Sequence, residues 1–87
     1  MSIAVRPFAP VIIETAQVGR LRTVTSVREA AECLLDAGWP KGRRGKAHKA
    51  AVGACHAALG GRLDAEAARA AFILAAQEAG IVASEGR

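Results

Sequence analysis

The chain has 87 residues and a formal net charge of +4, which leaves room for one small domain and none for a separate catalytic domain. Hydrophobic residues make up 52% of the chain, but 21 alanines are among them, and alanine buries little apolar area. A core this thin favours a fold that gains stability from a partner. No uncharged apolar stretch reaches the about 18 residues that a membrane-spanning helix needs, so we expect a cytoplasmic protein with no membrane contact.

Two β-branched runs come first, at 11–15 and 20–25, with a short turn between them that contains Gly19. This order predicts a β-hairpin. Alternate residues of a strand face opposite sides of the sheet, and in the second run we expect Val24 to face the core.

A first helix should begin at Ser26, because the sequence SVRE is a capping box. In this motif the Ser26 hydroxyl accepts from the Glu29 amide, and the Glu29 carboxylate reaches back to the Ser26 amide. The helix should end at Gly38, which suits the left-handed residue that often follows a helix, and Pro40 forbids continuation. We expect Trp39, between them, to fold back on the helix as a buried structural plug.

Two more helices are expected after this break. The second should run from about Gly45 to Leu59. The third should follow Asp64, which can cap it, and end at Gly80, with Ile81 placed for the contact that accompanies such an end. Together these elements predict an α+β fold in which an N-terminal β-hairpin packs on three α-helices.

The expected boundaries follow from the two ends of the chain. Residues 1–9 should form an extended lead, because Pro7 and Pro10 disfavour helix there. Residues 10–81 should form the single domain, and residues 82–87 a flexible tail.

The stretch between the first and second helices is the sharpest functional clue. It carries five cations in nine residues and no acid: Lys41, Arg43, Arg44, Lys46 and Lys49. The free amides and positive dipole end of the second helix would sit among them, which makes this basic loop a candidate anion-binding site. A loop is needed here whatever its charge, so we expect mainly a helix connection with a secondary capacity for anions. It is not a nucleotide-binding P-loop, since Pro40 stands where that motif has its first glycine.

Nucleic acid is the alternative partner of this loop, but it is not the favoured one. A helix-turn-helix interpretation would start its recognition helix with Asp64 and Glu66, whose carboxylates repel phosphate. Only 3% of the chain is aromatic, which is too little for a base-stacking platform.

The residues able to bind a soft metal are Cys33, His48, Cys55 and His56, and their spacing matches no metal-site pattern. Both cysteines lie inside helical patterns, so we expect buried free thiols. No oxyanion loop or third orienting group accompanies a cysteine–histidine pair. We therefore expect no metal, no cofactor, no catalytic residue and no enzymatic activity.

The third helix carries three consecutive large apolar residues, Phe72, Ile73 and Leu74, which span most of its circumference. One face cannot bury all three, so we expect a second apolar neighbour and take these residues as a candidate dimer interface. The open edges of a lone hairpin can also pair with a second copy. The resulting expectation is a small non-enzymatic protein-interaction or regulatory module that forms a homodimer and binds an unidentified protein partner.

Three segments, SVREAAECLLDAGWP, RGKAHKAAVGACHAALGG and AARAAFILAAQEAGI, resemble the uncharacterised bacterial family called domain of unknown function 982. The resemblance covers about residues 10–81 and is carried by the Trp39-Pro40 pair, Cys55, Gly60 or Gly61, Arg69 and Phe72. At His48 the chain departs from the family, which more usually has an aromatic residue there. The resemblance implies an α+β fold and implies no activity.

Overall fold

The computed structural model describes residues 6–14 and 20–84, without the side chain of Lys41. The expected turn around Gly19 therefore lies outside the described residues. In chain order the elements are β1 (Pro7–Glu14), β2 (Leu21–Ser26), α1 (Val27–Leu35), the short 3-10 helix η1 (Lys41–Arg43), α2 (Lys46–Leu59), α3 (Ala65–Ala79) and β3 (Val82–Ser84).

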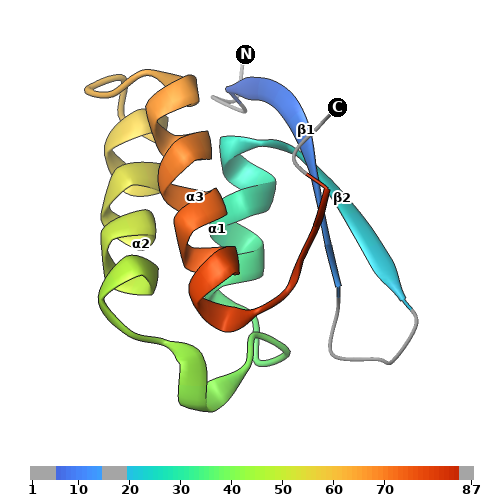
Figure 1. Cartoon of the computed structure of the whole chain (residues 1–87). Coiled ribbons are helices and arrows are strands. Elements are labelled where there is room, and N and C mark those ends of the chain that lie inside the picture. The colour runs from blue at the N-terminus through green and yellow to red at the C-terminus, as the bar shows by residue number, and fades with distance from the viewer. Residues whose placement is uncertain (1–5, 15–19, 85–87) are drawn as a thin grey trace.

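The three strands form one antiparallel sheet in the order β2-β1-β3, so β1 is central. Figure 1 shows α1, α2 and α3 on the same side of this sheet. The structure is thus a two-layer α+β fold in which the N-terminal hairpin packs on three helices, as predicted. The other face of the sheet, which we call the outer sheet face, has no described element over it.

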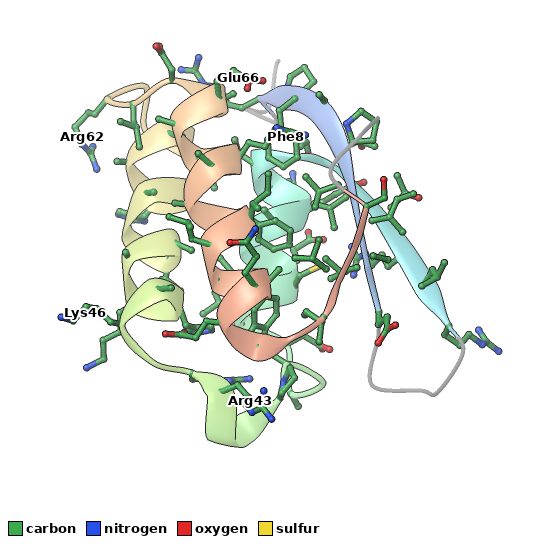
Figure 2. All side chains as sticks on the ribbon, viewed as in Figure 1. Phe8, Arg43, Lys46, Arg62 and Glu66 are labelled. Atoms are coloured by element: carbon green, nitrogen blue, oxygen red, sulfur yellow. The ribbon has the colours of Figure 1, made fainter. Side chains whose placement is uncertain are left out.

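The register of the hairpin decides which residues point to the helices. Val11 pairs with Val24, and neither residue is exposed. Phe8, which lies between the sheet and the helices, is also buried (Figure 2). Ile12 pairs with Thr23, and these two residues point to the outer sheet face, because neighbouring residues of a strand alternate between faces. The expectation that Val24 faces the core is confirmed.

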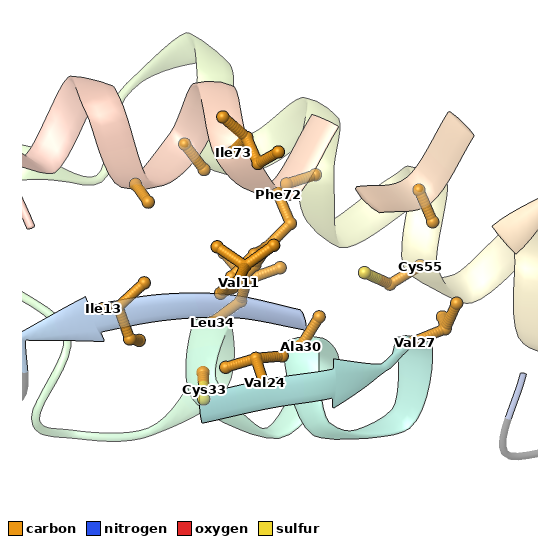
Figure 3. Packing of buried hydrophobic residues seen from close by; sticks show 14 of the residues in the cluster. Val11, Ile13, Val24, Val27, Ala30, Cys33, Leu34, Cys55, Phe72 and Ile73 are labelled. Carbon is orange, nitrogen blue, oxygen red and sulfur yellow. The ribbon is translucent and has the colours of Figure 1, made fainter. Parts of the chain in front are cut away.

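The core lies between the sheet and the helices, where Val11, Val24, Leu34 and Phe72 meet (Figure 3). Much of the remainder is alanine: Ala30, Ala51, Ala58, Ala68, Ala75, Ala76 and Ala79 are buried. These small side chains let α2 and α3 pack closely against each other. The core is thin, as the composition predicts, and it depends on a few large residues.

Both ends of the domain differ from the expected boundaries. β1 begins at Pro7, within the expected lead, and its register with β2 shifts between Pro7 and Val11. Proline is tolerated in a strand at such an irregularity, where its missing N–H is not needed. At the other end, Val82–Ser84 of the expected tail forms β3 beside β1, and residues 85–87 of that tail lie outside the described residues. Three residues are too few to show an alternating pattern, so this strand could not be predicted from the sequence.

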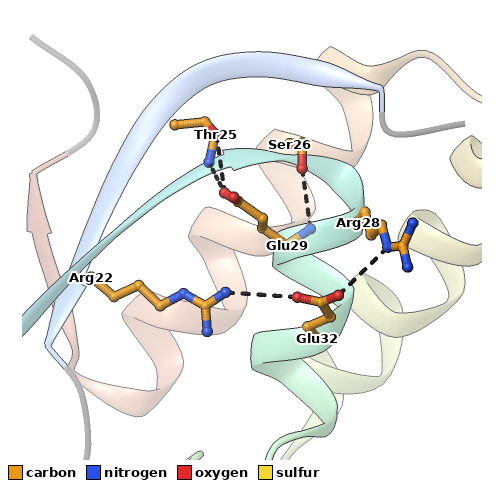
Figure 4. Close-up of polar contacts among 6 residues, drawn as sticks. All are labelled: Arg22, Thr25, Ser26, Arg28, Glu29 and Glu32. Carbon is orange, nitrogen blue, oxygen red and sulfur yellow. Dashed lines mark hydrogen bonds and ion pairs between the residues drawn. The ribbon is translucent and has the colours of Figure 1, made fainter. Parts of the chain in front are cut away.

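The start of α1 follows the predicted cap in one half and departs from it in the other. The Ser26 hydroxyl accepts a hydrogen bond from the Glu29 amide at 3.2 Å. The Glu29 carboxylate, however, accepts from the Thr25 amide at 2.7 Å and the Thr25 hydroxyl at 3.0 Å (Figure 4). Because β2 runs directly into α1, this carboxylate reaches the strand one residue further back than a capping box would place it.

The end of α1 is built differently from the prediction. The helix stops at Leu35, and Gly38 does not take a left-handed conformation. Instead Asp36 organises the turn, since its side chain accepts from the Gly38 amide at 3.0 Å and its carbonyl accepts from the Trp39 amide at 3.0 Å. A local aspartate turn replaces the expected glycine cap.

The end of α3 matches its prediction. Gly80 is left-handed, with φ 72° and ψ 28°, and its amide donates to the Gln77 carbonyl at 3.0 Å. The Ile81 amide donates to the Ala76 carbonyl, also at 3.0 Å, which completes the expected motif. At the start of α3, Asp64 occupies the cap position, but its side chain makes no capping hydrogen bond.

Candidate functional site

The candidate cations of the basic loop lie at one end of the molecule. Arg43, Arg44, Lys46 and Lys49 are exposed, and Lys41 begins η1. Figure 2 shows Arg43 and Lys46 at this end, around the start of α2. The fold therefore gathers the loop as the sequence suggests, and its binding capacity depends on the amides at the start of α2.

Those amides are already bound by a carboxylate of the same chain. Glu78, near the end of α3, accepts from the Gly45 amide at 3.1 Å, from the Ala47 amide at 3.2 Å and from the His48 amide at 3.2 Å. Hydrogen bonds from the amides, the Ala47 amide first, hold the pKa of the Glu78 carboxyl below its ordinary value. Glu78 thus sits where a bound anion was expected, and the expectation that these amides are free is wrong.

Gly45 permits this close approach. A Cβ atom built on Gly45 would lie 2.8 Å from the Glu78 carboxylate, which is closer than such contacts normally come. The cap joins Gly45, the residue just before α2, to a glutamate of α3 that is far away in the sequence. No local pattern around either residue indicates the other, so the role of Glu78 could not be predicted from the sequence.

Two of the candidate cations also have contacts within the fold. The Arg44 guanidinium donates to the Asp36 carbonyl at 2.6 Å, which joins the basic loop to the end of α1. The Arg43 guanidinium lies beside Gly80, where a built Cβ would be 3.5 Å from Nη1. A cation next to a helix C-terminus is favourable, because the helix dipole is negative there. These arginines help to hold the loop against α1 and α3.

Behind the loop lies a small aromatic cluster. Trp39 is only 3% exposed, and its ring lies 5.6 Å from the His48 ring and 5.9 Å from the Phe72 ring, centroid to centroid. The prediction that Trp39 is a buried plug is confirmed. Its indole N–H finds no acceptor among the described residues, and a buried donor left in this state costs about 1–3 kcal/mol.

His48 links α2 to the end of α1. Its Nε2 lies 2.7 Å from the Leu34 carbonyl, and since a carbonyl can only accept, Nε2 carries the proton and donates. His48 is 7% exposed, so the bond is made inside the protein. A histidine at this position therefore combines ring packing against Trp39 with a polar contact that a purely hydrocarbon aromatic ring could not make.

Beside Trp39 the surface opens into a cavity of about 320 Å³, which we call the Trp39 hollow. Its apolar lining comes from Ile13 and Leu21 of the hairpin, from Trp39, and from Ile81 after α3. Its charged lining comprises Glu14, Arg20, Arg22 and Asp36. The hollow was not predicted, because it forms where three segments distant in the sequence come together.

The two cysteines are buried free thiols, as expected. Burial raises the pKa of Cys55 to about 11 and also raises the pKa of Cys33 above its ordinary value. A thiol must ionise to act as a nucleophile, so neither is activated at neutral pH. Within the described ranges, no cluster of three histidine, cysteine or acidic residues could hold a metal ion.

The candidate dimer interface on α3 is reduced to one residue. Phe72 is fully buried in the core and Ile73 is 9% exposed, whereas Leu74 is 58% exposed. The sheet and the other helices already cover Phe72 and Ile73, so these two residues need no second copy of the chain to bury them. Phe72 and Ile73 therefore cannot form the interface that the sequence predicted. Of the three residues, Leu74 alone is exposed to solvent.

Three antiparallel strands with three helices on one face define the class of the protein, a small two-layer α+β domain. The chain belongs to the family described as "Protein of unknown function (DUF982)", whose model matches residues 9–83. The resemblance seen in the sequence is thereby confirmed. No curated protein and no solved structure matches the chain. In the part of the chain that the structure describes, no helix has the length and apolar character needed to cross a membrane.

Proposed function

We propose that the protein is a small non-enzymatic protein-interaction module that forms a homodimer through the outer sheet face. The observation that carries the proposal is the composition of this face. Thr23 and Thr25 are exposed on it, Leu21 is 60% exposed, and Ile12 is half-buried at its centre. Apart from Glu14 at the hairpin end, these β1 and β2 positions are uncharged, although 23% of the chain is charged.

A second copy fits this face better than it fits the edge of β2. The Glu29 carboxylate occupies the Thr25 amide, and Glu32 lies 3.8 Å from Arg22, so side chains of α1 already engage β2. An edge protected in this way resists pairing with another strand. The outer sheet face, with an uncharged centre, can meet its own copy across a two-fold axis without bringing like charges together.

The size of the face sets the expected strength. The strands have 8, 6 and 3 residues and lie about 4.8 Å apart, so at about 3.3 Å per residue the face spans on the order of 300 Å². A stable interface usually buries about 800 Å² on each partner. We therefore expect a weak, reversible dimer that forms at high protein concentration. We further expect the protein to act in the cytoplasm, where its two thiols stay reduced.

Sedimentation from micromolar to millimolar protein tests the proposal. The mass should rise from 9.0 kDa towards twice that value as concentration increases. Thr23→Lys should abolish the rise, because two-fold packing places the new cations close together. Ala70→Lys is the control, since Ala70 is exposed on α3, in the helix layer, and is not part of the outer sheet face. A mass that stays at that of the monomer, or equal association of both variants, would rule out this interface.

Anion or nucleic-acid binding by the basic loop is the second candidate. It is supported by the exposure of Arg43, Lys46 and Lys49 at one end of the molecule. It is weakened by Glu78, which fills the helix amides and adds a negative charge there. A salt-sensitive affinity for a labelled oligonucleotide would favour this candidate, because phosphate contacts release counterions. An affinity for a protein partner would depend far less on salt.

A further inference from the structure

We propose that the Trp39 hollow binds a small zwitterion with an apolar body, of the kind represented by a free apolar amino acid. Binding of this small molecule would be a further function, in addition to the protein interaction proposed above. The size of the hollow, its lining and the state of Trp39 support this ligand.

The size of the hollow limits the ligand. A volume of about 320 Å³ lies at the lower end of the about 300–1,000 Å³ that small-molecule sites span. A ligand of amino-acid size can enter such a space, whereas a nucleotide or a folded segment would remain mostly outside it. Ile13 and Ile81 line it together with the Trp39 ring, so an apolar side chain would find a suitable surface.

The charges of the lining determine the polar end of the ligand. Arg20 lies just before β2, Arg22 lies within it, and Asp36 lies in the turn after α1, whereas Glu14 ends β1 with its side chain on the outer sheet face. Arg20, Arg22 and Asp36 thus bring both signs of charge to one small cavity. A ligand with both an ammonium and a carboxylate can pair with each sign, whereas a ligand with a single charge leaves the other sign unmatched and is repelled by its own sign.

Trp39 provides an independent observation. It lines the hollow, it is 3% exposed, and its indole N–H has no acceptor among the described residues. Buried polar groups of folded proteins are nearly always hydrogen-bonded. A small shift of the ring on binding would let a ligand carboxylate accept from this N–H. As the only tryptophan of the chain, Trp39 also reports occupation of the hollow by its emission.

Three matched ligands test the charge requirement: L-phenylalanine, phenylacetate and phenethylamine. They share an aromatic body, and the last two each lack one of the charges. With selective excitation of Trp39, L-phenylalanine should change the emission saturably. The affinities of phenylacetate and phenethylamine should be lower by a factor of about ten or more. Equal binding of all three, or no response to L-phenylalanine, would overturn the proposal.

Two variants separate the hollow from general charge effects. Arg22 and Arg28 both lie near Glu32, at 3.8 Å and 3.5 Å, and are similarly exposed, but only Arg22 lines the hollow. Arg22→Gln should weaken L-phenylalanine binding about tenfold. Arg28→Gln should leave it unchanged while losing a comparable ion pair. Equal affinities of the two variants would contradict the proposal.

A second pair tests the apolar wall. Ile81 and Val82 are both half-buried at the end of the chain that follows α3, but only Ile81 lines the hollow. Ile81→Ala should weaken binding about threefold or more, and Val82→Ala should not change it. The opposite order, or no difference, would count against the site. All titrations use dilute protein, at which the proposed dimer dissociates, so failure of the dimer leaves this test intact.

Discussion

The unpaired amides at the starts of α1 and α2 are capped by residues at very different separations in the sequence. At α1, Ser26 and Glu29 supply the cap from within four residues of sequence. At α2, no side chain near Gly45 makes a capping hydrogen bond, and Glu78 of α3 binds the amides instead. The first cap can form before the chain folds, whereas the second exists only once α3 has packed against α2. The second cap therefore reports on the tertiary fold.

The largest expected effect is at the plug that holds α1 and α2 together. Trp39→Ala removes a buried ring that contacts His48 and Phe72, and it should cost about 3–5 kcal/mol. A small domain has only about 5–15 kcal/mol in total, so the variant should be close to unfolding at ambient temperature. Urea denaturation followed by circular dichroism measures the loss. A red-shifted, freely quenched emission of native Trp39 would contradict its burial.

The next effect concerns the bond that ties α2 to the end of α1. His48→Phe keeps a ring against Trp39 but removes the donor to the Leu34 carbonyl, and we expect a loss of about 1–3 kcal/mol. Denaturant midpoints of wild type and variant decide this. His56→Phe, at an exposed position on the same helix, is the control and should change stability little. Equal midpoints would show that packing alone holds the two helices together.

Removing the local cap should have a smaller effect. Ser26→Ala leaves the Glu29 amide without its partner, and the loss of such a cap costs about 0.5–2 kcal/mol. The change should lower the thermal midpoint without altering the arrangement of α2. Amide exchange in α1 and α2 would show this. If α2 loosened as much as α1, the two helix starts would not be independent.

These two starts also show what the sequence could predict. The Ser26 cap, the Gly80 ending, the hairpin and the burial of Trp39 depend on neighbouring residues or on a residue's own character, and all were predicted. Glu78 at the start of α2 and the Trp39 hollow depend on how distant segments meet, which a single sequence does not contain. The end of α1 was predicted at the wrong residue for a different reason. Asp36 and Gly38 could each form a local turn, and the structure shows the turn of Asp36.

The smallest effect should come from the charge of the basic loop. Changing Arg43, Arg44 and Lys46 together to serine removes the Arg44 contact with the Asp36 carbonyl and the Arg43 charge beside Gly80, but it also relieves repulsion between Lys46 and the positive start of α2. Stability should change by less than about 1 kcal/mol, as is usual for exposed charges. Thermal melts of wild type and the triple variant measure this. A large loss would mean that the loop is more than a connection.

The same triple variant tests the second candidate function. If the loop binds phosphate, the triple variant should lose a salt-sensitive affinity for an oligonucleotide. Each lost phosphate contact should lower the slope of affinity against salt concentration by about 0.7–0.9 on logarithmic scales. Titration at two salt concentrations compares the two proteins. We expect indistinguishable curves, because Glu78 already occupies the amides of α2.

The pH dependence of stability follows from the two carboxylates. The pKa of Glu29 is lowered mainly by the Thr25 amide, and that of Glu78 mainly by the Ala47 amide. A lowered folded-state pKa gives a stabilisation that is fully present above the unfolded-state pKa and is lost as pH falls through the folded-state pKa. Acid should therefore loosen both helix starts. In Glu78→Gln, acid should no longer loosen the start of α2, because the titrating carboxyl is gone. Acid should still loosen the start of α1, where Glu29 remains.

The most direct measurement is the titration of the Glu78 carboxyl by carbon NMR, in wild type and in Gly45→Ala. The structure predicts a pKa below that of an ordinary glutamate in the wild type, because three amides bind the ionised form. It predicts a return towards the ordinary value in Gly45→Ala, where the new Cβ would push the carboxylate away. An ordinary pKa for Glu78 in wild type, unchanged by the alanine, would show that α3 does not cap α2.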